Sequence, residues 1–153
     1  LEVAEHIREE DSNCFIKSLI NHGDIILFSA AIPFQGGQNH VNEQFPDYWE
    51  EKFSKFDYYF VDNIRDLIWN NAKVDVWYKQ NAFLVVHKNK IELFTKKNTI
   101  KNTVHPDLYL QKALELNAVK NKYKLVIEGR TGIRNSYKIL WKSIKNYFND
   151  CQK

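Results

Sequence analysis

The sequence contains few residues that form disulfides or interrupt helices and strands. Its 153 residues include two cysteines, three prolines and five glycines, and no methionine. Cys14 and Cys151 stand far apart and match no metal-ligand spacing, which favours reduced thiols over a disulfide framework. No apolar run approaches the roughly 18 residues of a membrane span, and no basic segment followed by an apolar one opens the chain. These absences predict a soluble, cytoplasmic protein. Because the first residue is Leu1 rather than Met, we also expect a fragment of a longer chain.

Short motifs with a strong chemical meaning are absent as well. The chain has no Gly-x-Gly-x-x-Gly, no phosphate-binding loop, no paired Cys-x-x-Cys and no His-x-x-x-His. We therefore expect no metal site. A lone histidine such as His6 is more often a packing and hydrogen-bonding residue than a ligand.

What the chain does contain is enough apolar surface for one core, with 44% hydrophobic and 14% aromatic residues. Its charge is uneven. Residues 1–88 carry eight Lys and Arg against fourteen Asp and Glu, a net charge of −6, whereas residues 89–153 carry fourteen against five, a net charge of +9. This predicts an acidic domain over 1–88 and a basic, mainly helical extension over 89–153. The basic residues either solvate two amphipathic helices or face an anionic partner.

Periodicity predicts strands and helices in the order β-α-β-α-β-β, followed by two helices. Leu1–Ile7 reads like the end of the first strand running into a helix. The last two strands are predicted to form an antiparallel pair added to a parallel sheet. The strand candidates are Leu1–Ile7, Ile25–Phe28, Tyr58–Val61, Val74–Tyr78 and Ala82–Val86, with a possible short strand at Ile91–Phe94. The helices begin near Asp11, Pro46 and Pro106, with a turn at Ile64–Ile68 and a final apolar stripe from Ile133 to Phe148. Lys88–Lys101 is expected to be a linker.

The loop Ser29–Gln44 after the Ile25 strand carries an unusual concentration of hydrogen-bonding groups. Seven of the ten residues from Gln35 to Gln44 have polar side chains that donate or accept. Ligands bind at the carboxyl ends of strands in α/β sheets, so this loop is the candidate active-site loop. The alternative is a solvated polar loop, in which His40 only caps a turn.

Three segments resemble class I S-adenosylmethionine-dependent methyltransferases. Leu1–Ile7, reading Leu-Glu-Val-Ala-Glu-His-Ile, is similar to the segment after that family's fourth strand, and Asp24–Pro33 is similar to its fifth strand. Ala31–Gln44 together with Trp77–Asn81 resembles a bacterial subgroup found among carbohydrate or surface-polysaccharide genes. The resemblance covers about residues 1–88.

The resemblance implies a Rossmann-like α/β sheet with the strand order 3-2-1-4-5-7-6, in which only strand seven is antiparallel. The predicted elements correspond to strands four to seven, so the chain is expected to be the C-terminal half of such a sheet. Strands one to three, with their glycine-rich turn, are missing. The implied cofactor is S-adenosyl-L-methionine, and the isolated chain is expected to be inactive and to self-associate.

The resemblance also implies roles for particular residues. Small-molecule or carbohydrate acceptors are the expected substrates, and His40 and Glu43 are the expected catalytic residues. His40 is the expected general base, because the ordinary pKa of a histidine suits that role at neutral pH. The expected cofactor-binding residues are Leu1, Glu2, Val3 and His6. The expected substrate-binding residues are Gln38, Asn42, Trp77, Tyr78, Gln80 and Asn81.

A second hypothesis comes from the charge pattern alone. The chain would be a non-catalytic binding module whose basic helical part grips an anionic partner. Nucleic acid is not the expected partner of the methyltransferase.

Overall fold

The computed structural model describes residues 1–94 and 102–150, with the side chains of 148–150 left out. The chain divides into two compact units, Leu1–Leu110 and Gln111–Lys153. The division falls beyond the predicted boundary between residues 88 and 89, because His105 and Leu108 are buried within the first unit. The second half of the predicted linker, residues 95–101, lies outside the described residues. Cys151 also lies outside them, and Cys14 is a free, exposed thiol.

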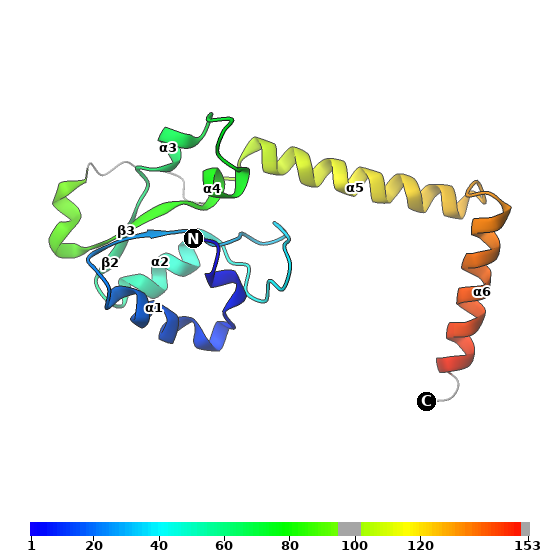
Figure 1. The fold of residues 1–153 in the computed structure, drawn as a ribbon, viewed down its shortest axis with the longest axis horizontal. Coiled ribbons are helices and arrows are strands. Elements are labelled where there is room, and N and C mark those ends of the chain that lie inside the picture. Colours follow the sequence, from blue (N-terminus) through cyan, green and yellow to red (C-terminus); the bar gives the residue numbers. More distant parts are fainter. Residues whose placement is uncertain (95–101, 151–153) are drawn as a thin grey trace. The chain divides into compact units, whose positions relative to one another are not determined.

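A three-stranded sheet lies at the centre of the first unit (Figure 1). Its strands are β1 (Ile25–Phe28), β2 (Tyr58–Val61) and β3 (Phe83–His87). The order is β1-β3-β2, and β3 runs antiparallel to both neighbours, so β1 and β2 run in the same direction. The α/β class and these three strands are as the sequence predicted, but the antiparallel partners of β3 are β1 and β2 and not Val74–Tyr78, the partner that the sequence predicted.

Three predicted strands are wrong. Residues 1–3 belong to no strand, and Ala4–His6 is a short 3-10 helix, η1, because a lone backbone bond from the Glu2 amide to the Ser29 carbonyl does not make a ladder. The predicted parallel crossover from this segment to β1 is therefore absent from the described residues. Within Val74–Tyr78 the helix α4 (Val76–Asn81) begins, and Ile91–Phe94 falls largely in the 3-10 helix η3 (Lys88–Leu93).

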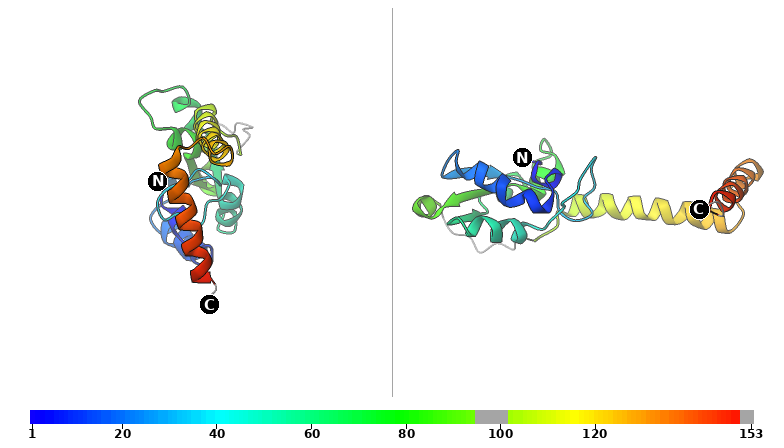
Figure 2. Two further views of the ribbon diagram at one scale, coloured as in Figure 1. Left: turned by 90° about the vertical axis from the view of Figure 1, so that its right-hand side faces the viewer. Right: turned by 90° about the horizontal axis from the view of Figure 1, so that it is seen from below.

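The helices of the first unit follow the predicted signals. A 3-10 turn η2 (Glu9–Asp11) leads into α1 (Ser12–Ile20), and α2 (Pro46–Ser54) begins at a proline in its first turn, where the missing N–H is not needed. The turn predicted at Ile64–Ile68 is the helix α3 (Arg65–Ile68). Figure 1 and the view from below in Figure 2 show α1 and α2 together on one side of the sheet.

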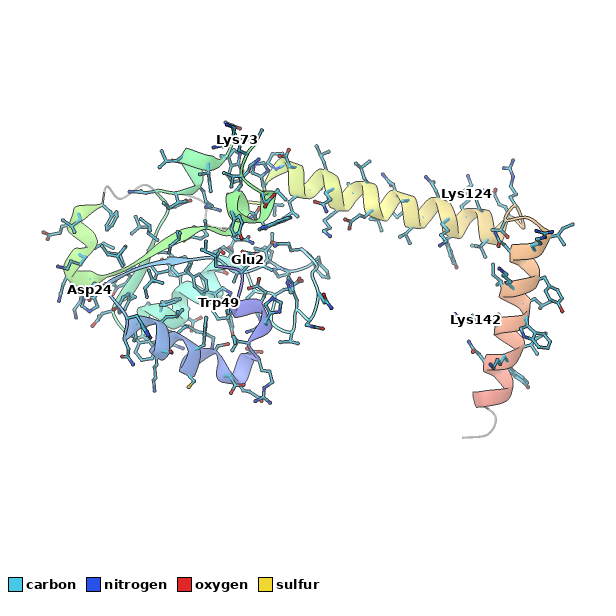
Figure 3. All side chains as sticks on the ribbon, viewed as in Figure 1. Glu2, Asp24, Trp49, Lys73, Lys124 and Lys142 are labelled. Carbon is cyan, nitrogen blue, oxygen red and sulfur yellow. The ribbon has the colours of Figure 1, made fainter. Side chains whose placement is uncertain are left out.

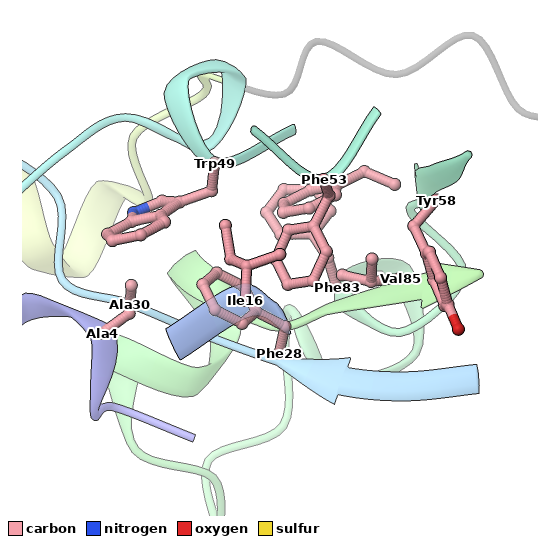
Figure 4. Packing of buried hydrophobic residues seen from close by; sticks show 10 residues of the cluster. Ala4, Ile16, Phe28, Ala30, Trp49, Phe53, Tyr58, Phe83 and Val85 are labelled. Carbon is pink, nitrogen blue, oxygen red and sulfur yellow. The ribbon is translucent and has the colours of Figure 1, made fainter. Parts of the chain in front are cut away.

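The core joins α1 and α2 to that side of the sheet (Figure 4). Phe28 of β1 is its centre, because its ring lies 5.3 Å from Phe53, 5.6 Å from Trp49 and 5.8 Å from Phe60, measured between centroids. Tilted and edge-on arrangements of this kind are the favoured ones for aromatic pairs. The cluster contains Ala4, Ile16, Phe28, Ala30, Trp49, Phe53, Tyr58, Phe60, Phe83 and Val85.

A buried ion pair ties α3 to the sheet. The Arg65 guanidinium donates from Nε to both carboxylate oxygens of Asp62, at 3.1 and 3.0 Å, and a further bond runs from Nη2 to Oδ2. Its plane also covers the Phe83 ring, with Cζ 4.2 Å from the centroid, and Nη1 donates to the Gln80 carbonyl at 3.3 Å. These contacts join α3, α4 and β3.

The helices α5 (Pro106–Ile127) and α6 (Ile133–Asp150) are as predicted, and the second unit begins within α5. A Schellman motif ends α5: the Arg130 amide donates to the Leu125 carbonyl and the Gly129 amide to the Val126 carbonyl, with Gly129 at φ 66°. In the described residues, none of the helices is both long and apolar enough to cross a membrane.

Candidate functional site

The polar loop after β1 folds back onto the N-terminal segment. The carbonyl of Glu5 accepts two backbone bonds, from the Val41 amide at 2.9 Å and from the Asn42 amide at 3.0 Å. At the other end of the loop, the Ser29 hydroxyl and carbonyl accept from the Glu2 amide at 2.9 and 3.0 Å. The residues expected to bind cofactor and those expected to act in catalysis are thus neighbours.

His40 and Glu43 form a fixed pair. Their Nδ1 and Oε1 atoms lie 2.8 Å apart, and their side chains are only 13% and 19% exposed. The Glu43 carboxylate also accepts from the Phe34 amide at 2.8 Å and the Gly36 amide at 2.9 Å, so the loop backbone holds it in place. When the Glu43 carboxylate accepts this bond, Nδ1 of His40 is the donor, and Nε2 is the ring nitrogen that Glu43 does not engage.

Gly37 makes room for this imidazole. A Cβ atom added at Gly37 would lie 2.2 Å from both Cε1 and Nε2 of His40, which is less than any real contact. The backbone of residue 37 and the ring of residue 40 therefore occupy touching positions that only glycine permits.

Three side chains with metal-binding groups meet beside this pair. Ligand atoms of Glu5, His6 and His40 all lie within 4.8 Å of one another. The Glu5 side chain is fully buried, and neither of its carboxylate oxygens has a hydrogen-bond partner. The His6 and His40 rings meet edge to face, with centroids 4.9 Å apart, and the His6 Nδ1 lies 3.2 Å from the Asn39 carbonyl oxygen.

Glu2, which Figure 3 labels within the first unit, is held by amide side chains from two other segments. Its carboxylate accepts from the amides of Asn81 and Gln35, both at 3.2 Å, and the Asn81 amide also donates to Gln35 Oε1 at 2.9 Å. Burial raises the pKa of the Glu2 carboxyl above its ordinary value, and the negative charge of Glu5 raises it further. Hydrogen bonds from Ser29, Asn81 and Gln35 oppose this shift.

The other predicted site residues divide into two groups. Asn42 and Gln80 are buried and satisfied within the protein: Asn42 bonds Ser12 and Gln44, and Gln80 bonds the backbone of Thr103 and His105. These two amides tie elements together, so neither is free to contact a substrate. The predicted residues Leu1, Val3, Gln38 and Trp77 are exposed, and Tyr78 is half-buried with its ring 6.3 Å from that of Trp77.

The site residues predicted from the sequence did not include two residues of this region, Glu5 and Gln35. Glu5 was visible as a carboxylate next to His6, but His40 is far away in the sequence and only the fold of the loop brings it near. Gln35 was one of many polar loop residues, and nothing in its local pattern marked it as the partner of Glu2 and Asn81.

A separate hollow of about 450 Å³ lies beside α3 and the start of α5 in the first unit. It is lined by Trp69, Asn70, Ala72, Lys79, His105, Pro106 and Asp107. The His105 ring is held there by bonds to the Trp69 carbonyl and the Asp107 amide. This hollow contains none of the predicted site residues.

No protein-family model matches the sequence, and no curated protein and no solved structure matches it either.

Proposed function

We propose that this chain is the C-terminal part of an S-adenosylmethionine-dependent methyltransferase that acts on a small-molecule or carbohydrate acceptor. The observation that carries the proposal is the strand order β1-β3-β2 with an antiparallel β3 between two strands of common direction. The resemblance of the sequence implies this arrangement for strands five, seven and six. An antiparallel strand inserted between its two predecessors is an uncommon topology, which gives the agreement weight.

The free edge of β1 supports the proposal. Among the described residues β1 pairs only with β3, and the side chains of Ile25 and Leu27 on this strand are about half exposed. An open edge with apolar side chains normally needs a cover. In the proposed sheet the remaining parallel strands would lie along this edge.

The site suits methyl transfer to a hydroxyl group. When bound, S-adenosylmethionine would supply an activated methyl group and would leave as a neutral thioether, and Glu2 and His6 are among the residues that would hold it. The acceptor proton passes to Nε2 of His40, and the Glu43 carboxylate stabilises the imidazolium through Nδ1. Positioning of the two reactants supplies much of the rate in such a displacement.

An acceptor with a sugar-like ring suits the exposed aromatic side chain on α4. Trp77 is 40% exposed at the start of this helix, whereas Asn81 at its end is buried and bound to Glu2 and Gln35. An exposed aromatic face is suited to contact with a sugar ring.

Calorimetric titration of the natural full-length protein with S-adenosylhomocysteine tests the proposal. We expect saturable binding that is weakened by Glu2→Ala, with Glu9→Ala as an exposed control on the same segment. A folded full-length protein that does not bind this compound would rule the methyltransferase out.

A second candidate function rests on α6. Its apolar residues share one side, where Ile133, Tyr137, Leu140, Trp141 and Ile144 are exposed, and its basic residues flank that side at Arg134, Lys138, Lys142 and Lys145. A helix of this type, with tryptophan and aliphatic groups beside lysines, suits the surface of an anionic membrane.

Sedimentation with vesicles tests this candidate. We expect the full-length protein to bind vesicles containing phosphatidylserine, to bind pure phosphatidylcholine far less, and to lose binding when Trp141 is replaced by Glu. Equal sedimentation of the wild type and Trp141→Glu would rule out α6 as the binding element.

A further inference from the structure

We propose that Glu5, His6 and His40 bind a divalent transition-metal ion, a role that the sequence did not predict. The binding itself does not depend on the proposed methyl transfer, because it follows from three side chains that the fold brings together.

The geometry needs only a small adjustment. Ligand atoms around a bound ion at bonds of roughly 2.0–2.2 Å lie about 3 Å apart, and here they lie within 4.8 Å. His6 is exposed on a short 3-10 helix, so its ring can turn, whereas Glu5 and His40 are held more firmly. Within this proposal, the exposed His6 side chain is the ligand that moves on binding.

The state of Glu5 calls for a cation. Burying a carboxylate without a hydrogen bond or a counter-charge is unfavourable, and both oxygens of this fully buried side chain have no hydrogen-bond partner in the described part of the chain. The nearby Glu2 is bound by the amides of Asn81 and Gln35, so its carboxyl group needs no ion. A divalent ion would supply the partner that the Glu5 carboxylate oxygens lack.

Both histidines already have the outer partners of metal ligands. The Glu43 carboxylate accepts from His40 Nδ1, and the Asn39 carbonyl lies 3.2 Å from His6 Nδ1. A ligating histidine usually donates its second N–H to a carboxylate or a backbone carbonyl, which fixes the ring and directs Nε2 to the metal. Here one histidine has each kind of partner.

The ligand types select the ion. Two imidazoles and one carboxylate suit Mn²⁺, Fe²⁺, Co²⁺ or Zn²⁺ better than Ca²⁺ or Mg²⁺, which prefer oxygen ligands alone. Three protein ligands leave coordination positions open. If the proposed methyl transfer also holds, an acceptor hydroxyl bound there would lose its proton more readily, and His40 would be a ligand in place of the base.

The test is titration of the full-length protein, stripped with EDTA and free of cofactor, with Co²⁺ followed by absorption and with Mn²⁺ followed by calorimetry. We expect one ion per chain and a visible absorption band from Co²⁺ bound to nitrogen and oxygen ligands. Glu5→Gln and His40→Asn should each weaken binding by at least about 10-fold, and Glu43→Gln, which leaves the ligands intact, by about 10-fold. His22→Asn on α1 is the control and should not change the affinity.

The apoprotein supplies a second measurement. Glu5→Gln should not lower the melting temperature of the metal-free protein, because the Glu5 carboxyl has no hydrogen bond to lose, and it should abolish the stabilisation that Mn²⁺ gives to the wild type. Absence of binding to the folded wild type at millimolar Mn²⁺, Co²⁺ and Zn²⁺, or binding that Glu5→Gln and His40→Asn leave unchanged, would overturn the proposal. Because no cofactor is present, either result is independent of the outcome with S-adenosylhomocysteine.

Discussion

Nδ1 of His40 and Oε1 of Glu43 lie 2.8 Å apart, across one turn of a loop that has no regular secondary structure. The carboxylate is itself held by two backbone amides, from Phe34 and Gly36, so the loop fixes the carboxylate and the carboxylate fixes the imidazole. The free Nε2 therefore has a defined position although it belongs to a loop. This is the arrangement that a base or a metal ligand requires.

If the proposed methyl transfer holds, replacing His40 by Asn should lower turnover of the full-length protein by about 10²-fold or more at saturating cofactor. Affinity for S-adenosylhomocysteine should stay unchanged, because the imidazole acts on the acceptor. Turnover and calorimetry of this variant, with His22→Asn as the control, measure the effect. A loss of only a few-fold would assign the chemistry to another group.

Gly37→Ala should displace the His40 ring without unfolding the protein. The new Cβ would occupy the space of the imidazole, at 2.2 Å from two ring atoms, whereas the ring can swing toward solvent. We expect metal affinity and turnover to fall with a small change in melting temperature. Gly23→Ala is the matched control, because its Cβ would meet only the Ile25 carbonyl, at 4.0 Å. Unaltered metal affinity and turnover in Gly37→Ala would mean that the position of the ring is unimportant.

Asp62→Ala should lower the free energy of unfolding by about 3–5 kcal/mol. The change leaves the buried Arg65 guanidinium without its carboxylate, while the stacking on Phe83 and the bond to the Gln80 carbonyl remain. Urea unfolding measures it. Breaking the exposed ion pair between Lys88 and Asp57 with Lys88→Gln should change the stability far less. If the two variants lowered the free energy of unfolding by similar amounts, burial would not explain the contribution of the Asp62–Arg65 ion pair.

Glu2→Gln should change how stability depends on pH. The pKa of Glu2 is raised in the folded protein above the ordinary value of 4.5, chiefly by burial, so folding favours the protonated carboxyl. This contribution is present below pH 4.5 and is lost as the pH rises through the folded pKa. The stability of Glu2→Gln relative to wild type should therefore increase with pH above 4.5. Melting temperatures of both proteins in metal-free buffers across this range provide the measurement, and a constant difference would refute it.

The sequence was a good guide where local signals and burial agreed. Apolar runs such as Tyr58–Val61 became strands, and Pro46 opened a helix because both its fixed backbone angle and its missing N–H suit that position. The loop after β1 was singled out from its concentration of polar side chains, and His40 and Glu43 were both named within it.

The alternation of apolar and polar residues gave a wrong prediction where contacts with distant residues determine the secondary structure. Val74, Val76 and Tyr78 alternate like a strand, yet Val76–Asn81 is helical, and this helix buries Gln80 and Asn81 against His105 and Glu2. Leu1–Ile7 also looked strand-like but has no neighbouring strand in the described residues. The meeting of Glu5 with His40 depends on the return path of the whole loop, which no short window of sequence contains.

The Glu5 carbonyl oxygen accepts two hydrogen bonds, from the Val41 and Asn42 amides, and these bonds link residues more than 30 positions apart. Those two amide hydrogens are shielded from solvent exchange only while the N-terminal segment is docked on the loop. Their deuterium uptake therefore reports undocking, and the two amides should give the same free energy of opening once each rate is corrected for its intrinsic exchange rate. Closing so long a loop also costs conformational entropy before the contacts that compensate for it have formed. This part of the molecule should therefore become protected from exchange late in refolding, after the β1–β3 ladder.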